Sequence, residues 1–294
     1  MSRVLLTGAS GFVGRHALTA LGDAGHEVHA VARRRGADAP GVIWHEADLL
    51  ASCAVVSEVE PEILVHLAWY AEHSKFWTSP ENLRWVAASL ELLRAFAHAG
   101  GQRVVMAGTC AEYEWSRELY PEDAPLHPST LYGAAKHGLH TIAAAYAQQV
   151  GLSLAWGRLF FLYGPFEAPA RLVPSLVRAL LAGARAPMTA GTQQRDFMHV
   201  ADAAAAFAAL ADSALTGAVN VASGQGVELR ELASLIAAHC GRPELLGIGE
   251  LPMRDGDPPS LVADAARLHG ELGFQPRLSL DAGLKDTIAW WRAR

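Results

Sequence analysis

Two side chains four residues apart, Tyr132 and Lys136, form the pair in this chain that is best suited to move a proton. They lie in a helical pattern that begins after Pro128-Ser129-Thr130, so the spacing places both on one helical face. A free phenol titrates at about pH 10, but a neighbouring ammonium favours its deprotonated form. The pattern therefore predicts a general acid or base. A surface pair without a chemical role is the alternative.

Thr109 is the candidate third member of this group. It follows the apolar run Val104–Ala107, so we expect it at the carboxyl end of a strand, where open parallel sheets bind their ligands. A hydroxyl there could hydrogen-bond a reacting oxygen, although threonine is also a common turn residue.

A glycine-rich turn directly follows the apolar run Val4–Leu6 and reads Thr7-Gly8-Ala9-Ser10-Gly11-Phe12-Val13-Gly14. Glycines at this spacing, between a strand and a helix, allow the backbone and the helix N-terminus to approach a pyrophosphate. The turn predicts a dinucleotide site, and a tight turn without a ligand is the alternative. The residues that we expect at the cofactor are Thr7, Gly8, Ser10, Gly11, Phe12, Val13 and Gly14.

The end of the second expected strand bears on the choice of cofactor. It reads Val31-Ala32-Arg33-Arg34-Arg35 and contains no carboxylate to bind an adenosine ribose. Because arginine can bind a 2′-phosphate, Arg33 and Arg34 favour NADP(H), with NAD(H) possible and a solvated basic turn as the alternative. Further along, Asp48 and Leu49 are expected to face the adenine, unless Asp48 is only a helix cap.

Short apolar runs alternate with amphipathic segments in the first two-thirds of the chain, which predicts an α/β fold with a doubly wound, Rossmann-type parallel sheet. We expect a dinucleotide-binding domain over residues 1–163 that also receives a later strand and helix from about 195–222. Residues 164–294 should form mainly a smaller substrate-binding lobe. The expected strands are Arg3–Leu6, Val28–Ala32, Val42–Trp44, Ile63–Leu67, Arg103–Ala107, Leu154–Phe160 and Val219–Val221, and the expected helices are Gly14–Gly22, Leu83–Ala99, Tyr132–Val150 and Ala201–Ala211.

The bulk composition narrows the class of protein. The chain has 294 residues, a net charge of −6 and three cysteines without paired spacing. These features argue against a nucleic-acid binder and a disulfide scaffold, and we expect no membrane span and a cytoplasmic location. His137 and His140 share a helical face, but no further ligands accompany them, so exposed histidines are a simpler interpretation than a metal site.

The whole chain resembles the extended short-chain dehydrogenase/reductase family, which includes NAD(P)-dependent sugar-nucleotide epimerases, dehydratases and ketoreductases. Besides the two motifs above, the resemblance rests on His66-Leu67-Ala68, Arg158–Pro165, Arg195–Asp202, Gly217–Gly224, Arg254-Asp255-Gly256-Asp257, Asp264 and Leu272-Gly273-Phe274-x-Pro276.

The resemblance implies roles for individual residues. Thr109, Tyr132 and Lys136 would be the catalytic triad. Tyr132 and Lys136 would also bind the cofactor, Lys136 on the nicotinamide ribose, together with Leu67 and Ala68. Two arginines, Arg195 and Arg254, would bind the pyrophosphate of a nucleotide-sugar substrate, and Thr109 would also contact the substrate. A homodimer is the expected assembly.

Departures from the family pattern bear on the reaction. The dehydratases carry an acidic pair after the catalytic threonine, whereas this chain has Cys110-Ala111. Glu112 comes one residue later, and strand alternation should turn it away from the position of Ala111. Aromatic residues in the segment 69–77 could stack on a sugar or base, or simply pack.

These departures and the arginine run favour NADPH-dependent reduction of a 4-keto-6-deoxy sugar nucleotide, with Tyr132 as the general acid. An NAD-dependent sugar-nucleotide 4-epimerase with the same triad is the main alternative. A non-catalytic NADP-binding sensor is a third hypothesis.

Overall fold

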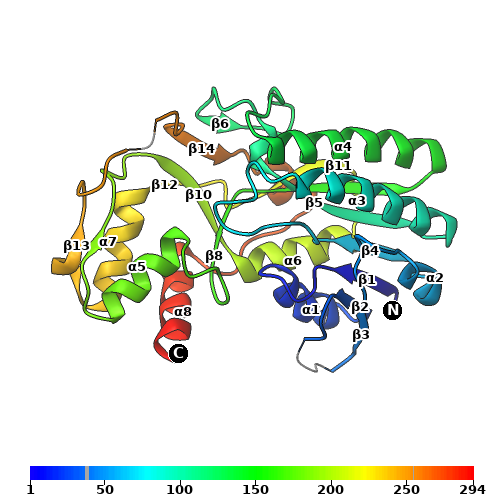
Figure 1. Cartoon of the computed structure of the whole chain (residues 1–294), viewed down its shortest axis with the longest axis horizontal. Coiled ribbons are helices and arrows are strands. Elements are labelled where there is room, and N and C mark those ends of the chain that lie inside the picture. Colours follow the sequence, from blue (N-terminus) through cyan, green and yellow to red (C-terminus); the bar gives the residue numbers. More distant parts are fainter. Residues whose placement is uncertain (37–39, 254) are drawn as a thin grey trace.

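A seven-stranded parallel sheet forms the larger part of the molecule in the computed structural model, which describes residues 1–36, 40–253 and 255–294 (Figure 1). The strand order is β11-β7-β5-β4-β1-β2-β3. The strands are β1 (Arg3–Thr7), β2 (Glu27–Ala32), β3 (Val42–Glu46), β4 (Ile63–His66), β5 (Arg103–Thr109), β7 (Ser153–Leu159) and β11 (Gly217–Val221).

Helices cover both faces of this sheet because its strands are apolar on both sides. On one face, α1 (Gly14–Asp23) and α6 (Val200–Ala211) pack together over a core that includes Leu6 and Phe207. The opposite face carries α2 (Val55–Val59), α3 (Glu81–His98) and α4 (Leu131–Val150), which bury a second core around Leu64 and Trp156. The predicted doubly wound α/β sheet is confirmed.

A smaller lobe lies beside the large sheet (Figure 1). A five-stranded sheet there has the order β12-β10-β14-β6, with β8 paired to β10. Its strands are β6 (Leu119–Tyr120), β8 (Phe161–Tyr163), β10 (Gln194–His199), β12 (Gly226–Glu228) and β14 (Ser260–Ala263), and the remaining elements of the lobe are β9 (Ala186–Pro187), β13 (Leu246–Gly247), α5 (Leu172–Leu181), α7 (Leu229–Cys240) and α8 (Leu280–Arg292). Apolar side chains of α5, α7 and α8 form its core.

The chain passes between the two sheets several times. It leaves the large sheet after β5 to form β6, returns with α4 and β7, and crosses again at β8. Of the segment 195–222, α6 and β11 belong to the large sheet and its cover, whereas β10 pairs in the smaller sheet. Three short helical segments complete the described chain: η1 (Cys110–Glu112), η2 (Pro243–Leu245) and the π-helix η3 (Arg267–Glu271). In the residues described here, no helix is both long and apolar enough to cross a membrane.

Candidate active site

Three neighbouring strands end at the same edge of the large sheet, and the predicted site residues follow them. Thr7 ends β1, His66 ends β4 and Thr109 ends β5. β1 and β5 flank β4, and Thr7 is in register with His66. Because parallel strands share one carboxyl edge, this order brings the glycine turn, the loop after β4 and Thr109 to one place.

The glycine turn between β1 and α1 is too tight for side chains at two positions. Gly8 has a φ of +71°, and a Cβ at Gly14 would lie 2.0 Å from the carbonyl oxygen of Gly8. Ser10 and Gly11 are exposed, while Phe12 and Val13 are half-buried. No side chain caps the N-terminus of α1, so this helix end is without a side-chain acceptor, as the binding of a pyrophosphate requires.

The loop after β4 packs directly against this turn. A Cβ at Gly8 would lie 2.7 Å from the backbone nitrogen of Ala68. Thr7 shares a 2.7 Å hydrogen bond with His66 Nδ1, and His66 Nε2 lies 2.8 Å from Ser89 Oγ. Burial lowers the pKa of His66 to about 3, with Lys136 lowering it further. The histidine is therefore neutral and joins the two strand ends. Leu67 is half-buried and Ala68 is buried beside it.

Lys136 reaches from α4 into the space between β4 and β5. Its ammonium donates to the carbonyl of Ala107 at 2.9 Å and lies 3.7 Å from the centre of the Trp69 ring. The side chain is only 4% exposed. Burial lowers its pKa to about 7, and the carboxylate of Glu112 acts in the opposite direction.

Tyr132 lies one turn before Lys136, as predicted, but its surroundings change the expected electrostatics. Burial raises the pKa of its phenol to about 12, while a hydrogen bond with Thr109 and the charge of Arg171 lower it. In the protein alone, removal of the phenol from water outweighs the neighbouring charges, so the pKa of Tyr132 is raised rather than lowered. The rings of Phe76 and Trp77 meet Tyr132 edge to face, at 4.9 and 5.7 Å between centroids.

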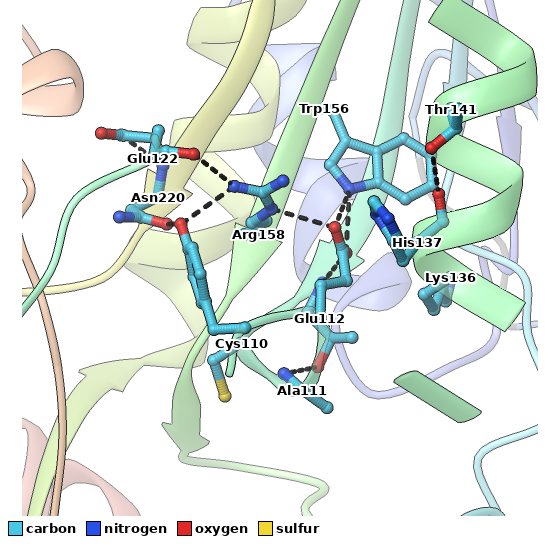
Figure 2. Close-up of polar contacts among 12 residues, drawn as sticks. Cys110, Ala111, Glu112, Glu122, Lys136, His137, Thr141, Trp156, Arg158 and Asn220 are labelled. Atoms are coloured by element: carbon cyan, nitrogen blue, oxygen red, sulfur yellow. Dashed lines mark hydrogen bonds and ion pairs between the residues drawn. The ribbon is translucent and has the colours of Figure 1, made fainter. Parts of the chain in front are cut away.

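Thr109 begins a single helical turn rather than continuing the strand. Its hydroxyl accepts from the backbone N–H of Ala111 at 3.2 Å, and its own N–H donates to the carboxylate of Glu112 at 2.8 Å. The strand alternation assumed for Glu112 does not apply, because residues Cys110–Glu112 form η1. Figure 2 shows Glu112 directed at Arg158 and Trp156, and Glu112 is fully buried. Sequence reasoning did not find this role.

At the adenosine end of the expected cofactor site, Arg33 and Arg34 are exposed after β2. A carboxylate is present there after all: Glu46, at the end of the neighbouring β3, accepts from the backbone N–H of Arg35 at 3.0 Å. Asp48 accepts from the N–H of Leu50 at 3.1 Å and lines a hollow of about 530 Å³, and Leu49 is buried in the core.

One of the residues predicted to bind the substrate, Arg195, lies in the smaller lobe. Arg195, on β10, is 4% exposed, and its guanidinium donates to Asp257 at 2.6 Å and lies 5.5 Å from the centre of the Phe161 ring. Arg254 falls outside the described residues. Asp257, which fixes Arg195, belongs to the motif Arg254–Asp257 that the sequence already indicated.

The two helix histidines differ from the exposed pair that we expected. Both His137 and His140 are half-buried. The ring of His140 stacks on Trp156 with 4.8 Å between centroids, and burial lowers its pKa to about 4. We therefore interpret His140 as a residue that packs around Trp156.

The Rossmann-type sheet, the glycine turn after β1 and the Tyr132–Lys136 pair on α4 together define an extended short-chain dehydrogenase/reductase. The NAD dependent epimerase/dehydratase family matches residues 4–222, and the chain belongs to this family.

Individual relatives carry several related activities. The chain is 30% identical to a UDP-glucose 4-epimerase of Azospirillum brasilense, over 99% of this chain and 92% of that protein. It is 31% identical to a dTDP-glucose 4,6-dehydratase of an Actinoplanes species, over 59% of this chain and 55% of that protein. The solved structure of MoeE5 in complex with UDP-glucuronic acid and NAD is 33% identical, with a TM-score of 0.88 and 99% of both chains covered.

Proposed function

We propose that this protein is an NAD-dependent sugar-nucleotide 4-epimerase that acts on a UDP-linked hexose or hexuronate. The observation that carries the proposal is the grouping of Thr109, Tyr132 and Lys136 at the sheet edge that also bears the glycine turn. The similarity to the Azospirillum epimerase over almost the whole chain supports the epimerase over the ketoreductase that the sequence favoured. The similarity to MoeE5, whose structure holds UDP-glucuronic acid and NAD, supports NAD and a UDP-sugar as the ligands.

The cofactor would be held by the glycine turn and the loop after β4, together with Lys136. When bound, NAD supplies a reversible two-electron oxidation of the carbinol carbon. Tyr132 would accept the proton of the substrate hydroxyl and would later return a proton to the same oxygen. Thr109 holds the same oxygen by a hydrogen bond, and the ammonium of Lys136 favours the phenolate.

A dehydratase reaction needs an acid beside the threonine, and the turn after β5 offers none. Cys110 and Ala111 are buried, and burial raises the pKa of the Cys110 thiol to about 12. Glu112 is bound to Arg158 at 2.9 Å in the interior. The first acidic side chain in the sequence after Thr109 is therefore turned away from the place where water would be eliminated.

An NADPH-dependent 4-ketoreductase is the second candidate, favoured by the exposed Arg33 and Arg34 at the end of β2. Glu46 at the same edge weakens this argument, since its carboxylate would repel a 2′-phosphate. A non-catalytic NADP sensor would not need the three grouped side chains and is the least supported candidate.

One experiment separates these candidates. The purified protein is denatured and its released nucleotide identified, and the native protein is then incubated with UDP-glucose, UDP-glucuronic acid and a 4-keto-6-deoxy sugar nucleotide. The epimerase proposal expects released NAD(H) and a C4 epimer formed without consumption of added NADPH. If only the keto sugar reacts, with oxidation of NADPH, the protein is a ketoreductase instead. If no reaction occurs with any of these substrates, the non-catalytic sensor is the candidate that is left.

The expected homodimer is part of this proposal. Leu83 on α3 and Ile142 on α4 are 60% and 50% exposed, and the two helices pack side by side. Exposed apolar side chains on two adjacent helices support pairing with a second copy. Light scattering after gel filtration should give twice the chain mass of 31.3 kDa, and a Leu83→Glu variant should reduce it to one chain.

A further inference from the structure

Glu112 is a fully buried carboxylate surrounded by hydrogen-bond donors. Its oxygens accept from the Thr109 backbone N–H at 2.8 Å, from Trp156 Nε1 at 2.9 Å and from Arg158 Nε at 2.9 Å. An ionised carboxylate accepts hydrogen bonds only, so all three donors are matched. Figure 2 shows Glu112 between Arg158 and Trp156, on the side of β5 and β7 that faces α4.

The same contacts fix the turn that carries Thr109. The hydroxyl of Thr109 accepts a hydrogen bond from the N–H of Ala111, and the carboxylate of Glu112 accepts one from the N–H of Thr109. Together the two side chains form a reciprocal cap on η1. Gly108 makes this possible, because a Cβ there would lie 2.1 Å from Trp156 Nε1 and 2.7 Å from Glu112 Oε1. The position of the Thr109 hydroxyl therefore depends on Glu112.

Glu112 also acts on Lys136 through its charge. Burial lowers the pKa of Lys136 to about 7, and the Glu112 carboxylate is the group that opposes this effect. The other ionisable groups around the two residues come from β4, η1 and its end, α4 and β7. They include His66, Cys110, Tyr113, Tyr132, His137, His140 and Arg158.

Most of these surrounding groups carry no charge near pH 7. Burial lowers the pKa of His66 to about 3 and that of His140 to about 4, and it raises the pKa of Cys110 and of Tyr132 to about 12. Burial likewise raises the pKa of Tyr113. Arg158 keeps its charge and pairs with Glu112. Lys136 donates to the carbonyl of Ala107 and Glu112 accepts from the N–H of Thr109, so the ammonium and the carboxylate both contact the end of β5.

We propose that Glu112 is a positioning residue that holds the hydroxyl of Thr109 in place and supplies the buried negative charge that Lys136 needs to stay protonated. The role in turnover rests on the proposed function, whereas the effect on Lys136 does not. It explains why a carboxylate stands at this position although it does not reach the site where the dehydratases use their acids.

Titration of Lys136 tests the charge directly, because the chain has only three lysines, at positions 75, 136 and 285. Protein labelled with ¹³C at the lysine Cε is followed by NMR as pH is raised, without substrate or added cofactor. The signal of Lys136 is assigned with a Lys136→Met variant. Lys75 and Lys285, whose side chains are 66% and 60% exposed, serve as internal references.

Glu112→Gln should lower the titration midpoint of Lys136 by about one pH unit or more, since the carboxylate opposes the effect of burial. The amide NH2 of a glutamine at position 112 would face other hydrogen-bond donors, and the charge of Arg158 would lose its partner. A second variant, Glu112→Gln/Arg158→Met, therefore removes both charges and leaves no unpaired ion. Trp156→Phe is the matched control, because it deletes a hydrogen bond to the same carboxylate without changing its charge. Its midpoint should equal that of the wild type.

Glu112→Asp separates the two parts of the role. It keeps the charge but is one methylene shorter, so Lys136 should titrate as in the wild type while kcat falls about tenfold and KM changes little. Equal Lys136 midpoints in the wild type and in both charge-removing variants would overturn the proposal. A wild type that converts no UDP-sugar yet shows the shifted midpoints would refute the proposed reaction instead and leave the charge effect standing.

Discussion

The ammonium group of Lys136 lies 3.7 Å from the centre of the Trp69 ring, which is itself held by a 2.9 Å hydrogen bond from Trp69 Nε1 to Asn82. Trp69 belongs to the loop after β4 that packs on the glycine turn, and Lys136 also donates to Ala107 on β5. Lys136 is thus placed by two structural elements besides its own helix. Aromatic rings of the segment 69–77 pack on Tyr132 and Lys136.

Removal of the Trp69 ring should loosen Lys136. A buried cation–π contact contributes about 2 kcal/mol, so Trp69→Leu should weaken NAD binding by about tenfold and lower turnover to a similar extent. Calorimetric titration with NAD and initial rates measure the two effects. Trp85→Leu is the control, since the Trp85 ring packs 6.1 Å from that of Trp69 and no contact with Lys136 is described for it. Equal losses in both variants would show that the contact with Lys136 has no special role.

The phenol of Tyr132 should be needed for chemistry but not for folding or cofactor binding. Tyr132→Phe removes the proton carrier, so turnover should fall by about 10²- to 10⁴-fold, with NAD affinity unchanged within about twofold. Tyr146→Phe, on the same helix, should keep full activity. Turnover by Tyr132→Phe at the wild-type rate would contradict the proposed mechanism.

The Thr109 hydroxyl is expected to act on both the turn and the substrate. Thr109→Val deletes the acceptor for Ala111 N–H and the hydrogen bond to Tyr132. Turnover should fall by about 10²-fold, and the unfolding free energy by about 1 kcal/mol. Thr109→Ser keeps the hydroxyl and should recover most of both. Steady-state kinetics and urea unfolding provide the measurements, and a serine variant as poor as the valine variant would count against a role for the hydroxyl.

Glu167 is expected to cost stability at neutral pH. It is 4% exposed, its Oε2 has no partner, and burial raises its pKa from 4.5 to about 8, with Arg171 opposing this. The folded protein therefore binds a proton that the unfolded chain has lost between these two values, and stability decreases as pH rises through that window.

Glu167→Gln should thus be neutral below pH 4.5 and should stabilise the protein by a few kcal/mol (~2 or more) at pH 8. Urea unfolding at the two pH values measures the difference. Glu231→Gln on α7, where the side chain is exposed, should change neither value. A Glu167→Gln effect independent of pH would mean that the carboxyl is not neutral in the folded protein.

The fold and the strand ends could be predicted from the sequence because they depend on local patterns. Apolar runs followed by Thr7, His66 and Thr109 identify strand ends, and parallel strands bring such ends to one edge. The glycine turn is equally local, since Gly8 and Gly14 are required by contacts within the turn and with the next loop.

The orientation of Glu112 could not be predicted in this way. It depends on a helical turn replacing the strand, and on Trp156 and Arg158, which lie 44 and 46 positions away in the sequence. The raised pKa of Tyr132 also depends on distant side chains that bury it. The place of Glu46 could not be predicted from the end of the second strand, because it depends on the pairing of β3 with β2, which puts Glu46 opposite Ala32.

Cofactor choice is the remaining prediction. Arg33 and Arg34 are exposed at the end of β2, and Glu46 lies at the same edge. If NAD is the cofactor, an Arg33→Ser/Arg34→Ser variant should bind NAD as the wild type does and should bind NADP about tenfold more weakly than the wild type, because a phosphate contact with arginine is lost. Glu46→Gln, in contrast, should improve NADP binding by removing a repelling charge. Calorimetric titration of each variant with both nucleotides measures these affinities. If the wild type binds NADP more tightly than NAD, NADP(H) is the preferred cofactor, as the arginine run favoured.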